Sequence, residues 1–194
     1  MDRILMSFEL DGYIHLNNLL ADDFCFELTE ELRELILQNK TYKDPQCPLS
    51  EAIYGAETFD TLLIELLPYF ESISKKKLAP TYSYARLYAP GDELKIHIDR
   101  PSCEISATIT LGFDGEVWPF YVANDKEKTD TYRIDMKVGD AVLYYGTEKY
   151  HWREKYVEGK WQSQVFLHYV DVDGSFKEYI YDKRNGLNLL PNPY

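Results

Sequence analysis

Two stretches in the first 80 residues repeat apolar positions at helical spacing. The apolar residues of Asp22–Gln38 and of Glu57–Ser74 recur every three or four positions, which predicts a helix in each stretch. We expect Asp22 or Asp23 to cap the first helix, because a carboxylate accepts hydrogen bonds from the free amides of the first turn. Pro68 is expected to kink or break the second helix, since proline lacks the amide hydrogen that a helix interior needs.

The pattern changes at about Thr81, after a loop predicted at Thr41–Ser50. Short runs of β-branched and aromatic residues follow, separated by turn sequences such as Pro90-Gly91-Asp92. About eight short strands at this spacing are typical of a sandwich or barrel built from two sheets. The predicted strands cover residues 81–88, 93–97, 105–111, 117–122, 131–136, 141–145, 150–153 and 164–171.

The length of the protein fits one domain. It has 194 residues, of which 45% are hydrophobic, and this is enough for one packed core. We predict a mainly β fold with N-terminal helices in a single domain over residues 1–194. A helical flank covers 1–80, a β core covers 81–175 and a C-terminal tail covers 176–194.

Charge and cysteine content exclude several classes of partner and location. The net charge is −12, so a nucleic-acid partner is not expected, because phosphate binding needs clustered Lys and Arg. The three cysteines are irregularly spaced and form no CxxC pair, which indicates reduced thiols in a cytoplasmic protein. No apolar run approaches the roughly 20 residues of a membrane span, so we expect a soluble protein. The sequence carries no signal of oligomeric state.

Three residues have the pattern of a metal site. His97 and Asp99 are two positions apart on a predicted strand, so both side chains project from one face. His151 lies 52 positions after Asp99, on another predicted strand. Two imidazoles and one carboxylate occupy one face of an octahedral metal ion and leave three positions open, as in non-haem Fe(II) oxygen chemistry. A lone His-x-Asp is more often structural, so the surrounding motifs decide whether these residues are interpreted as a metal site.

Those motifs resemble the Fe(II)/2-oxoglutarate dioxygenases of the prolyl-hydroxylase type, over about residues 81–173. A Tyr-x-Pro-Gly turn precedes a His-x-Asp-x-Pro run, a Gly-Asp-plus-apolar strand precedes the distal histidine, and a closing strand follows it. Short bacterial and phage-type members carry similar runs. The matching segments are Tyr88-Ala89-Pro90-Gly91, His97-Ile98-Asp99-Arg100-Pro101, Val138–Tyr144, His151-Trp152-Arg153-Glu154 and Gln164–Asp171.

The resemblance implies both a fold and a reaction. The fold is a double-stranded β-helix, a cupin-like jelly roll, with the N-terminal helices on its outer sheet. The reaction is hydroxylation of an unactivated C–H bond with O₂ and 2-oxoglutarate, giving succinate and CO₂. His97, Asp99 and His151 would be both the Fe(II) ligands and the catalytic residues, and ascorbate would act as an activator. Family halogenases have a small residue at the position of Asp99, so halogenation is disfavoured.

The family holds the distal carboxylate of 2-oxoglutarate with a basic residue nine or ten positions after the distal histidine. Lys160 is His151 + 9 and is our first choice. Arg153 is the rival, because it shares strand parity with His151, and Arg86 is a third candidate. Tyr88 and His168 are the other residues expected to bind the cosubstrate.

The substrate is not determined by the sequence. The resemblance favours a prolyl or other peptidyl side chain, and a free amino acid or small metabolite fits a protein of this size nearly as well. Tyr84, Arg86, Arg100 and Trp118 are the candidate substrate contacts. The alternative from another class is a cupin-like barrel that binds a metal or ligand without turnover. It would lack a cosubstrate anchor.

Overall fold

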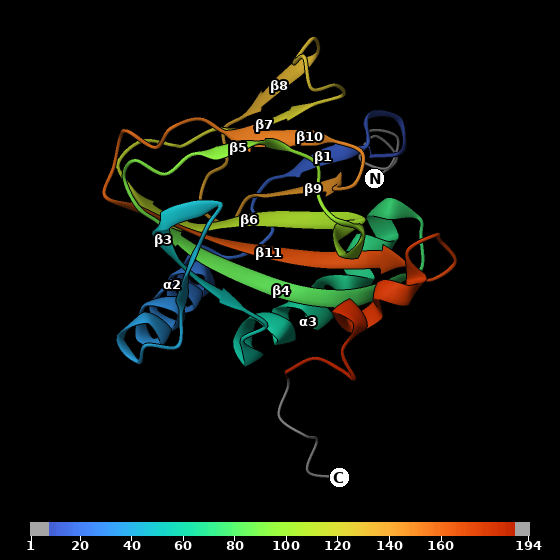
Figure 1. The fold of residues 1–194 in the computed structure, drawn as a ribbon, viewed down its shortest axis with the longest axis horizontal. Coiled ribbons are helices and arrows are strands. Elements are labelled where there is room, and N and C mark those ends of the chain that lie inside the picture. Colours follow the sequence, from blue (N-terminus) through green and yellow to red (C-terminus); the bar gives the residue numbers. More distant parts are fainter. Residues whose placement is uncertain (1–7, 189–194) are drawn as a thin grey trace.

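The computed structural model describes residues 8–188. Helices α2 and α3 and a series of antiparallel strands make up most of it, with two short 3-10 segments, η1 and η2 (Figure 1). In chain order the elements are β1 (Tyr13–Leu16), α2 (Asp22–Leu37), β2 (Tyr42–Asp44), β3 (Cys47–Tyr54), α3 (Glu57–Ser74), β4 (Leu78–Tyr88), β5 (Leu94–His97), η1 (Pro101–Cys103), β6 (Ile105–Asp114), β7 (Phe120–Ala123), β8 (Thr131–Ile134), β9 (Ala141–Tyr145), β10 (Tyr150–Arg153), β11 (Trp161–Asp171) and η2 (Lys177–Lys183).

The strands form two sheets that face each other. The larger has the order β1-β9-β6-β11-β4-β3-β2 and the smaller has the order β5-β10-β7-β8. Every pairing between these strands is antiparallel. From β4 to β11 the chain alternates between the two sheets, except that β7 and β8 form a hairpin within the smaller one. This is the winding of a double-stranded β-helix, so the predicted mainly β jelly-roll fold is confirmed.

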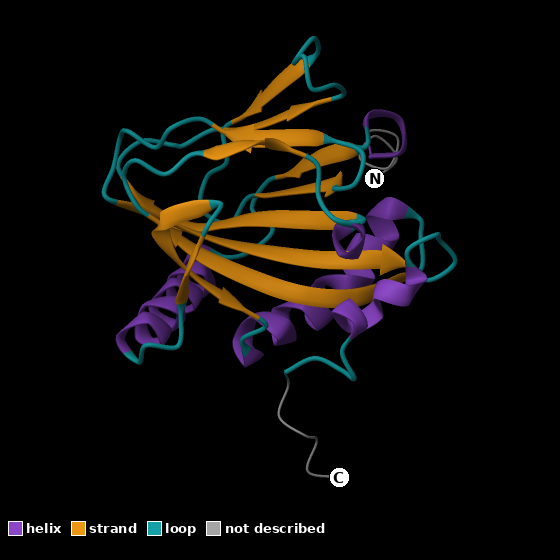
Figure 2. Cartoon of the chain, viewed as in Figure 1, coloured by secondary structure: helices purple, strands orange, loops and turns teal. Residues whose placement is uncertain are grey.

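Helices α2 and α3 lie on the outer side of the larger sheet (Figure 2). The apolar stripe that predicted each helix faces the sheet: Leu28 and Leu32 of α2 and Leu63 and Phe70 of α3 are at most 1% exposed. Burying one such side chain stabilises the fold by about 1.5–3 kcal/mol. The outer face of the larger sheet is therefore covered by the helices, and its inner face is left for the site. No helix within residues 8–188 is long and apolar enough to cross a membrane.

The structure corrects the local predictions made for the two helices. Ala21, not an aspartate, is the N-cap of α2, and no side chain caps it. Asp22 and Asp23 lie within the first turn, where their negative charges interact favourably with the helix dipole. Pro68 does not break α3, which continues to Ser74. The hydroxyl of Tyr169 donates to the carbonyl of Leu63 in the same part of the helix, at 2.7 Å, so tertiary contacts support the helix there.

The predicted loop at 41–50 is also wrong, because it forms most of a hairpin. Strands β2 and β3 pair with each other, and β3 continues the larger sheet by pairing with β4. The N-terminal flank is thus not purely helical, since β1 adds a strand at the other edge by pairing with β9. Prolines at 45 and 48 hid the hairpin. Pro45 is tolerated because it lies in the turn, and Pro48 because it lies outside the four residues of β3 that pair with β4.

Candidate metal centre

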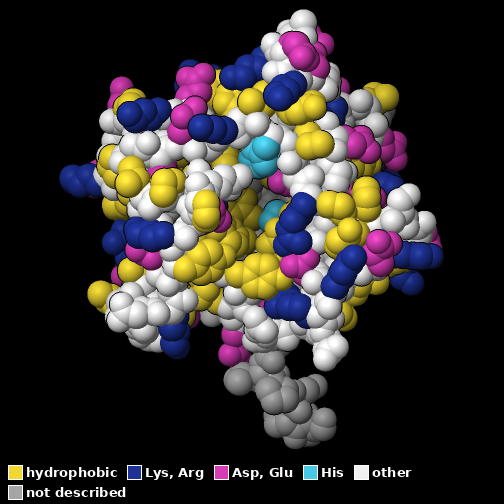
Figure 3. Space-filling model, in the orientation of Figure 1, with side chains coloured by type: hydrophobic (Ala, Val, Ile, Leu, Met, Phe, Trp, Pro, Cys, Tyr) yellow, Lys and Arg dark blue, Asp and Glu magenta, His cyan; other side chains and the backbone are white. Residues whose placement is uncertain are grey.

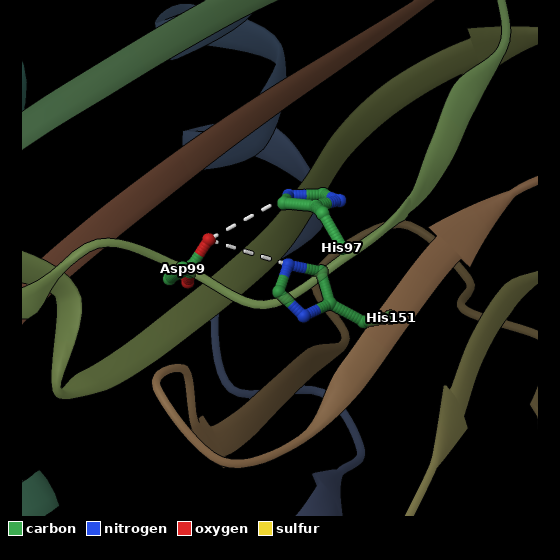
Figure 4. A group of neighbouring side chains, drawn as sticks. All are labelled: His97, Asp99 and His151. Carbon is green, nitrogen blue, oxygen red and sulfur yellow. Dashed lines mark ion pairs between the residues drawn. The ribbon is translucent and has the colours of Figure 1, made fainter. Parts of the chain in front are cut away.

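His97, Asp99 and His151 converge between the two sheets. His97 ends β5 and is the register partner of His151 on β10, and Asp99 follows β5 by two residues. The Oδ1 atom of Asp99 lies 3.6 Å from Nε2 of His97 and 3.4 Å from Nε2 of His151 (Figure 4). One ligand atom from each residue therefore lies within 4.8 Å of the others, as binding one metal ion requires.

The backbone fixes which nitrogen of each histidine is free. Nδ1 of His97 lies 2.8 Å from the carbonyl of Lys95, and Nδ1 of His151 lies 2.9 Å from the carbonyl of Lys149. A carbonyl only accepts hydrogen bonds, so each Nδ1 carries the proton and each Nε2 presents a lone pair to the common centre. Such outer partners hold metal-binding imidazoles in position in known metal sites.

The electrostatics favour the metal-binding protonation states. Burial lowers the pKa of His97, and the neighbouring His151 lowers it further, so the ring is neutral at pH 7. Burial of Asp99 would raise its pKa, but its interactions with the surrounding histidines, His151 first, outweigh that effect, and the pKa is lowered. Two imidazoles and a carboxylate are the donor set that suits Fe(II) with open positions. The residues present fit the metal.

Gly146, between β9 and β10, lets the backbone approach Asp99 closely. Its carbonyl accepts a hydrogen bond from the amide of Asp99 at 2.7 Å. A Cβ atom at this position would lie 2.5 Å from Oδ2 of Asp99 and closer still to the carbonyl of Cys103. The hydroxyl of Ser106 donates to that same Oδ2 at 3.0 Å. The carboxylate is therefore held from two sides. Sequence reasoning missed Gly146, and a glycine in a strand-to-strand turn carried no distinguishing signal.

The centre opens into a cavity of about 270 Å³ walled by aromatic rings. Histidine side chains are visible in a hollow framed by hydrophobic groups (Figure 3). Of the residues predicted for cosubstrate or substrate, the cavity is lined by Tyr84, Arg86, Tyr88, Arg100 and His168. Others that line it escaped the sequence reasoning: Asp44, Gln46, Tyr82, Cys103, Phe120, Tyr144 and Phe166. Asp44 and Gln46 were missed because their hairpin was predicted to be a loop.

His168 lies deep in this cavity, beside the metal ligands. Its Nδ1 is 2.8 Å from the hydroxyl of Ser106, and its ring packs on Tyr82 with centroids 4.5 Å apart. Burial lowers the pKa of His168 to about 4, so the ring is neutral near pH 7. His168, Asp99 and Cys103 also bring ligand atoms within 4.8 Å of one another. That group shares Asp99 with the first, so it belongs to the same site.

Arg153 is buried without an acidic partner. Its guanidinium donates to the carbonyl of Trp118 and to Sδ of Met136, and it packs over the rings of Trp118 and Phe120. No carboxylate within residues 8–188 forms an ion pair with it, and burial lowers its pKa to about 10. A charged group in that setting is costly unless an anion neutralises it. Arg153 is not itself among the residues that line the cavity, but it packs on Phe120, which does line it, as does Tyr88.

The structure does not bring Lys160 to the cavity. Its side chain is 81% exposed and forms an ion pair with Asp114 at 3.2 Å, at the hairpin end that precedes β11. On the strand that follows, uncharged Gln162 and Gln164 occupy the buried positions. The residue nine positions after the distal histidine therefore lies at the end of the hairpin and not inside the barrel.

Two other predicted contacts are already engaged. Trp118 is buried, and its indole nitrogen donates to the carbonyl of Glu154 at 2.8 Å, so it packs behind Tyr88 and does not line the cavity. Arg100 lines the cavity, but both of its terminal nitrogens donate to Asp182 of the C-terminal segment, at 2.6 and 2.9 Å. Arg100 thus ties that segment to the loop that carries Asp99.

Comparison with known proteins gives the fold a context. No family model matches the sequence, and no curated protein matches it either. Solved structures do match. The protein aligns with a prolyl-4-hydroxylase from Pseudomonas putida at a TM-score of 0.70 and 15% identity, covering 88% of this chain and 98% of that one. It has the fold of the 2-oxoglutarate oxygenases.

Two further structures extend this similarity. HygX from Streptomyces hygroscopicus, with nickel and 2-oxoglutarate bound, aligns at a TM-score of 0.73 and 14% identity over 89% of this chain and 88% of that one. SnoK, an alpha-ketoglutarate-dependent carbocyclase of nogalamycin biosynthesis, aligns at a TM-score of 0.75 and 12% identity. The alignment covers 99% of this chain and 94% of that one. At such identities the likeness concerns the fold, and the chemistry has to be argued from the site.

Proposed function

We propose that this protein is an Fe(II)/2-oxoglutarate-dependent dioxygenase that hydroxylates an unactivated C–H bond. The observation that carries the proposal is the convergence of His97, Asp99 and His151 inside the barrel, with both imidazole tautomers preset by backbone carbonyls. An ordinary core histidine has no reason to direct its lone pair at a second histidine and a carboxylate. Iron bound there would supply O₂ activation, with succinate and CO₂ as co-products.

We further propose that Arg153, not Lys160, anchors the distal carboxylate of 2-oxoglutarate. Arg153 is the buried guanidinium that lacks an acidic partner, whereas Lys160 is exposed and paired. A carboxylate beside Arg153 would form charge-assisted hydrogen bonds in a dry environment, where they are strong. Tyr88 lines the cavity and packs on Trp118, which Arg153 also contacts, and its hydroxyl would be a second donor to that carboxylate.

The remaining residues would orient the reactants and exclude water. His168 is neutral and buried beside Asp99, so we assign it a contact with the 1-carboxylate of the cosubstrate. Phe120, Tyr144 and Phe166 line the cavity around the metal ligands and leave little room for bulk water. Water exclusion strengthens the electrostatic contacts inside the site and protects reactive species.

The test is an anaerobic titration of 2-oxoglutarate into the Fe(II)-loaded protein. We expect the weak visible charge-transfer band of the chelate to appear, and to be absent in the His151→Ala variant. Folding of the variant is checked by circular dichroism. If iron binds to the unsubstituted protein and no band forms at saturating 2-oxoglutarate, the proposal is wrong.

A second candidate function is a cupin-like barrel that binds a metal or ligand without turnover. It is favoured by one observation, the position of Lys160 outside the cavity, since that residue was the first choice of cosubstrate anchor. The same titration separates the two functions. Metal binding without the chelate band would favour the non-catalytic barrel.

We also propose a cytoplasmic location and a small-molecule or peptide substrate, with ascorbate as an activator. Cys25, Cys47 and Cys103 are free and buried, as expected in a reducing compartment. A structural neighbour, the prolyl hydroxylase from Trichoplax adhaerens, was solved with a peptide fragment of hypoxia inducible factor. The choice between a peptide and a free molecule depends on the walls of the cavity.

A further inference from the structure

The cavity contains an ion pair that the metal centre does not use. Asp44 ends β2, Gln46 lies in the turn before β3, and Arg86 is on β4, where it is the register partner of Ala52 on β3. Arg86 Nη2 donates to Asp44 Oδ2 at 3.0 Å and to Gln46 Oε1 at 3.1 Å. The Arg86 side chain is 3% exposed and that of Asp44 is 22% exposed.

One hydrogen-bond donor of this pair has no partner within residues 8–188. Arg86 Nη1 donates to the hydroxyl of Tyr88 at 3.2 Å and to Sγ of Cys47 at 3.3 Å, but its Nε is buried with no acceptor. A buried donor without an acceptor is unusual in a folded protein. A buried ion pair also contributes little to the stability of a fold, because the cost of desolvating the two charges offsets the attraction between them. A pair that lines a cavity therefore has a better explanation in binding.

Gln46 connects the pair to the metal centre. Its Oε1 accepts from Arg86, so its Nε2 is the amide donor, and this atom lies 3.4 Å from Nε2 of His97. That nitrogen is the one assigned to the metal above. A single amide side chain thus spans from the guanidinium to a metal ligand. A group held at Asp44 and Arg86 would therefore lie near the residues that would hold the metal.

The two charges together define what the pair complements. A carboxylate and a guanidinium side by side match an ammonium and a carboxylate carried by the same carbon atom, which is the head of a free α-amino acid. A residue inside a peptide has neither charge, and a dicarboxylate would face Asp44 as a like charge. Exchanging one internal ion pair for two with the ligand keeps every charge neutralised.

The size and walls of the cavity support the same class. Its volume of about 270 Å³ has to hold the cosubstrate as well, and sites for drug-sized ligands begin at roughly 300 Å³. Phe120, Tyr144 and Phe166 line the remaining wall, which suits an apolar side chain. Together these features leave room for a small ligand with a charged head and an apolar body.

We propose that the substrate is a free α-amino acid with an apolar side chain, whose ammonium binds Asp44 and whose carboxylate binds Arg86. This inference rests on the proposed function. The reaction would convert one C–H bond of that apolar group into C–OH. One oxygen atom of O₂ enters the alcohol and the other enters succinate. Of the four electrons that O₂ accepts, two come from 2-oxoglutarate, which loses CO₂, and two come from the C–H bond that is oxidised.

The first experiment measures binding to the anaerobic complex of protein, Fe(II) and 2-oxoglutarate. Free L-amino acids with apolar side chains are compared with their N-acetyl and C-amide forms, by calorimetry and by the shift of the visible band. We expect a free amino acid to bind, and each capped form to bind at least tenfold more weakly. Equal binding of a doubly capped form, or binding by none of the free amino acids, overturns the inference.

The second experiment tests the residues. Asp44→Asn and Arg86→Gln are each expected to raise the dissociation constant of the amino acid at least tenfold, and Asp44→Asn is expected to leave that of 2-oxoglutarate unchanged. Arg86 donates to the hydroxyl of Tyr88, a proposed cosubstrate contact, so Arg86→Gln is expected to weaken 2-oxoglutarate less than it weakens the amino acid. Lys43→Ala is the matched control, because Lys43 is on the same hairpin and pairs outward with Glu51. We expect it to change neither constant. If Arg86→Gln does not fold, Asp44→Asn alone carries the test.

The outcomes separate the two levels of proposal. If the chelate band never forms in the unsubstituted protein, the proposed function fails and the substrate assignment fails with it. If the band forms and the free amino acids do not bind, only the substrate assignment fails. If Arg86→Gln weakens 2-oxoglutarate and not the amino acid, Arg86 is the cosubstrate anchor and the substrate assignment is wrong.

Discussion

Two buried guanidinium groups in the barrel differ in their electrostatic surroundings. Arg86 donates hydrogen bonds to the carboxylate of Asp44 and to two tyrosine hydroxyls. Arg153 instead donates to a backbone carbonyl and to a thioether. The same residue type can therefore serve two purposes in one barrel. Asp44 neutralises Arg86 within the protein, whereas Arg153 has no ion-pair partner within residues 8–188 and would be neutralised by a bound anion.

This contrast leads to a prediction for Arg153→Met. Removal of the guanidinium should raise the dissociation constant of 2-oxoglutarate roughly 10- to 100-fold, since a hydrogen bond to a charged group contributes about 1.5–3 kcal/mol. The ligand-free protein should be at least as stable as the unsubstituted one, because an unpaired buried charge is removed. Calorimetry and thermal unfolding measure the two effects.

Lys160→Ala is the comparison that gives the Arg153 result its meaning. Because Lys160 is exposed and paired with Asp114, its removal should change the 2-oxoglutarate dissociation constant less than twofold. A large loss of 2-oxoglutarate affinity in Lys160→Ala, with none in Arg153→Met, would show that Lys160 is the cosubstrate anchor, as the spacing in the family indicates.

Asp182 should make stability depend on pH in acid. Burial alone would raise the pKa of this carboxyl, but hydrogen bonds from Arg100, Ser102 and Tyr54 lower it to about 2. A carboxyl whose pKa is depressed on folding stabilises the protein above its unfolded pKa, near 3.8, and loses this contribution as the pH falls toward 2. The contribution is at most about 2 kcal/mol, since Arg100 is half exposed and solvent screens the pair.

The measurement compares urea unfolding of the unsubstituted protein and of Asp182→Asn between pH 2.5 and pH 6. Other carboxyls titrate in both proteins, so the difference between the two isolates Asp182. We expect that difference to be largest at pH 6 and to shrink below pH 4. A difference that stays constant over this range would show that the charge of Asp182 does not contribute.

At the scale of elements, the alternation of residues along a strand predicted which side chains share a face better than the sequence predicted where strands begin and end. Tyr84, Arg86 and Tyr88 alternate along one predicted strand, which puts them on the same face, and all three line the cavity. The predicted helix at 57–74 matches α3 at both ends. What the sequence could not provide is contact between distant segments. The Asp44 hairpin reaches the cavity only through its pairing with β4, and its two prolines masked its strand character.

The candidate site shows the same division. His97, Asp99 and His151 were predicted from local spacing and a family resemblance, and the structure brings them together. Lys160 was chosen by counting residues from the distal histidine, and a count cannot show where a hairpin ends and a strand enters the barrel. Asp182, more than 80 residues from Arg100, had no local signal at all.

The turn between β9 and β10 is the element on which the metal ligands depend most closely. Gly146→Ala should weaken metal binding by at least tenfold, because the added methyl group would press on the carboxylate of Asp99 and on the carbonyl of Cys103. Metal titration followed by calorimetry measures the change. Gly186→Ala is the matched control, since nothing lies within 4 Å of a Cβ there, and we expect it to bind metal normally.

Backbone conformation does not confound this comparison. Gly146 is not among the glycines with positive φ, so alanine is strained there only by its contacts. If Gly146→Ala binds metal as tightly as the control, the close approach to Asp99 is relieved by a local shift and is not needed for the site.

At the scale of the whole molecule, the metal ligands join segments that close the barrel. His97 and Asp99 flank the end of β5, His151 lies on β10, and both strands belong to the smaller sheet, while Ser106 of the larger sheet holds Asp99. A metal ion at this point would cross-link two strands and the loop between the sheets. Folding stability and metal occupancy should therefore be linked.

The final prediction follows from that linkage. A ligand that binds only the folded state stabilises it by about 2.7 kcal/mol at 100 times its dissociation constant. For a protein of this length, that corresponds to a rise in Tm of roughly 5–10 °C. We expect Fe(II) under anaerobic conditions, or Ni(II) in air, to give such a rise, and a chelator to reverse it. His97→Ala should fold and show no rise, because one of the two imidazole ligands is lost. An equal rise in His97→Ala and in the unsubstituted protein would place the stabilising metal elsewhere. In that case the convergence of the three residues would reflect packing and not metal binding.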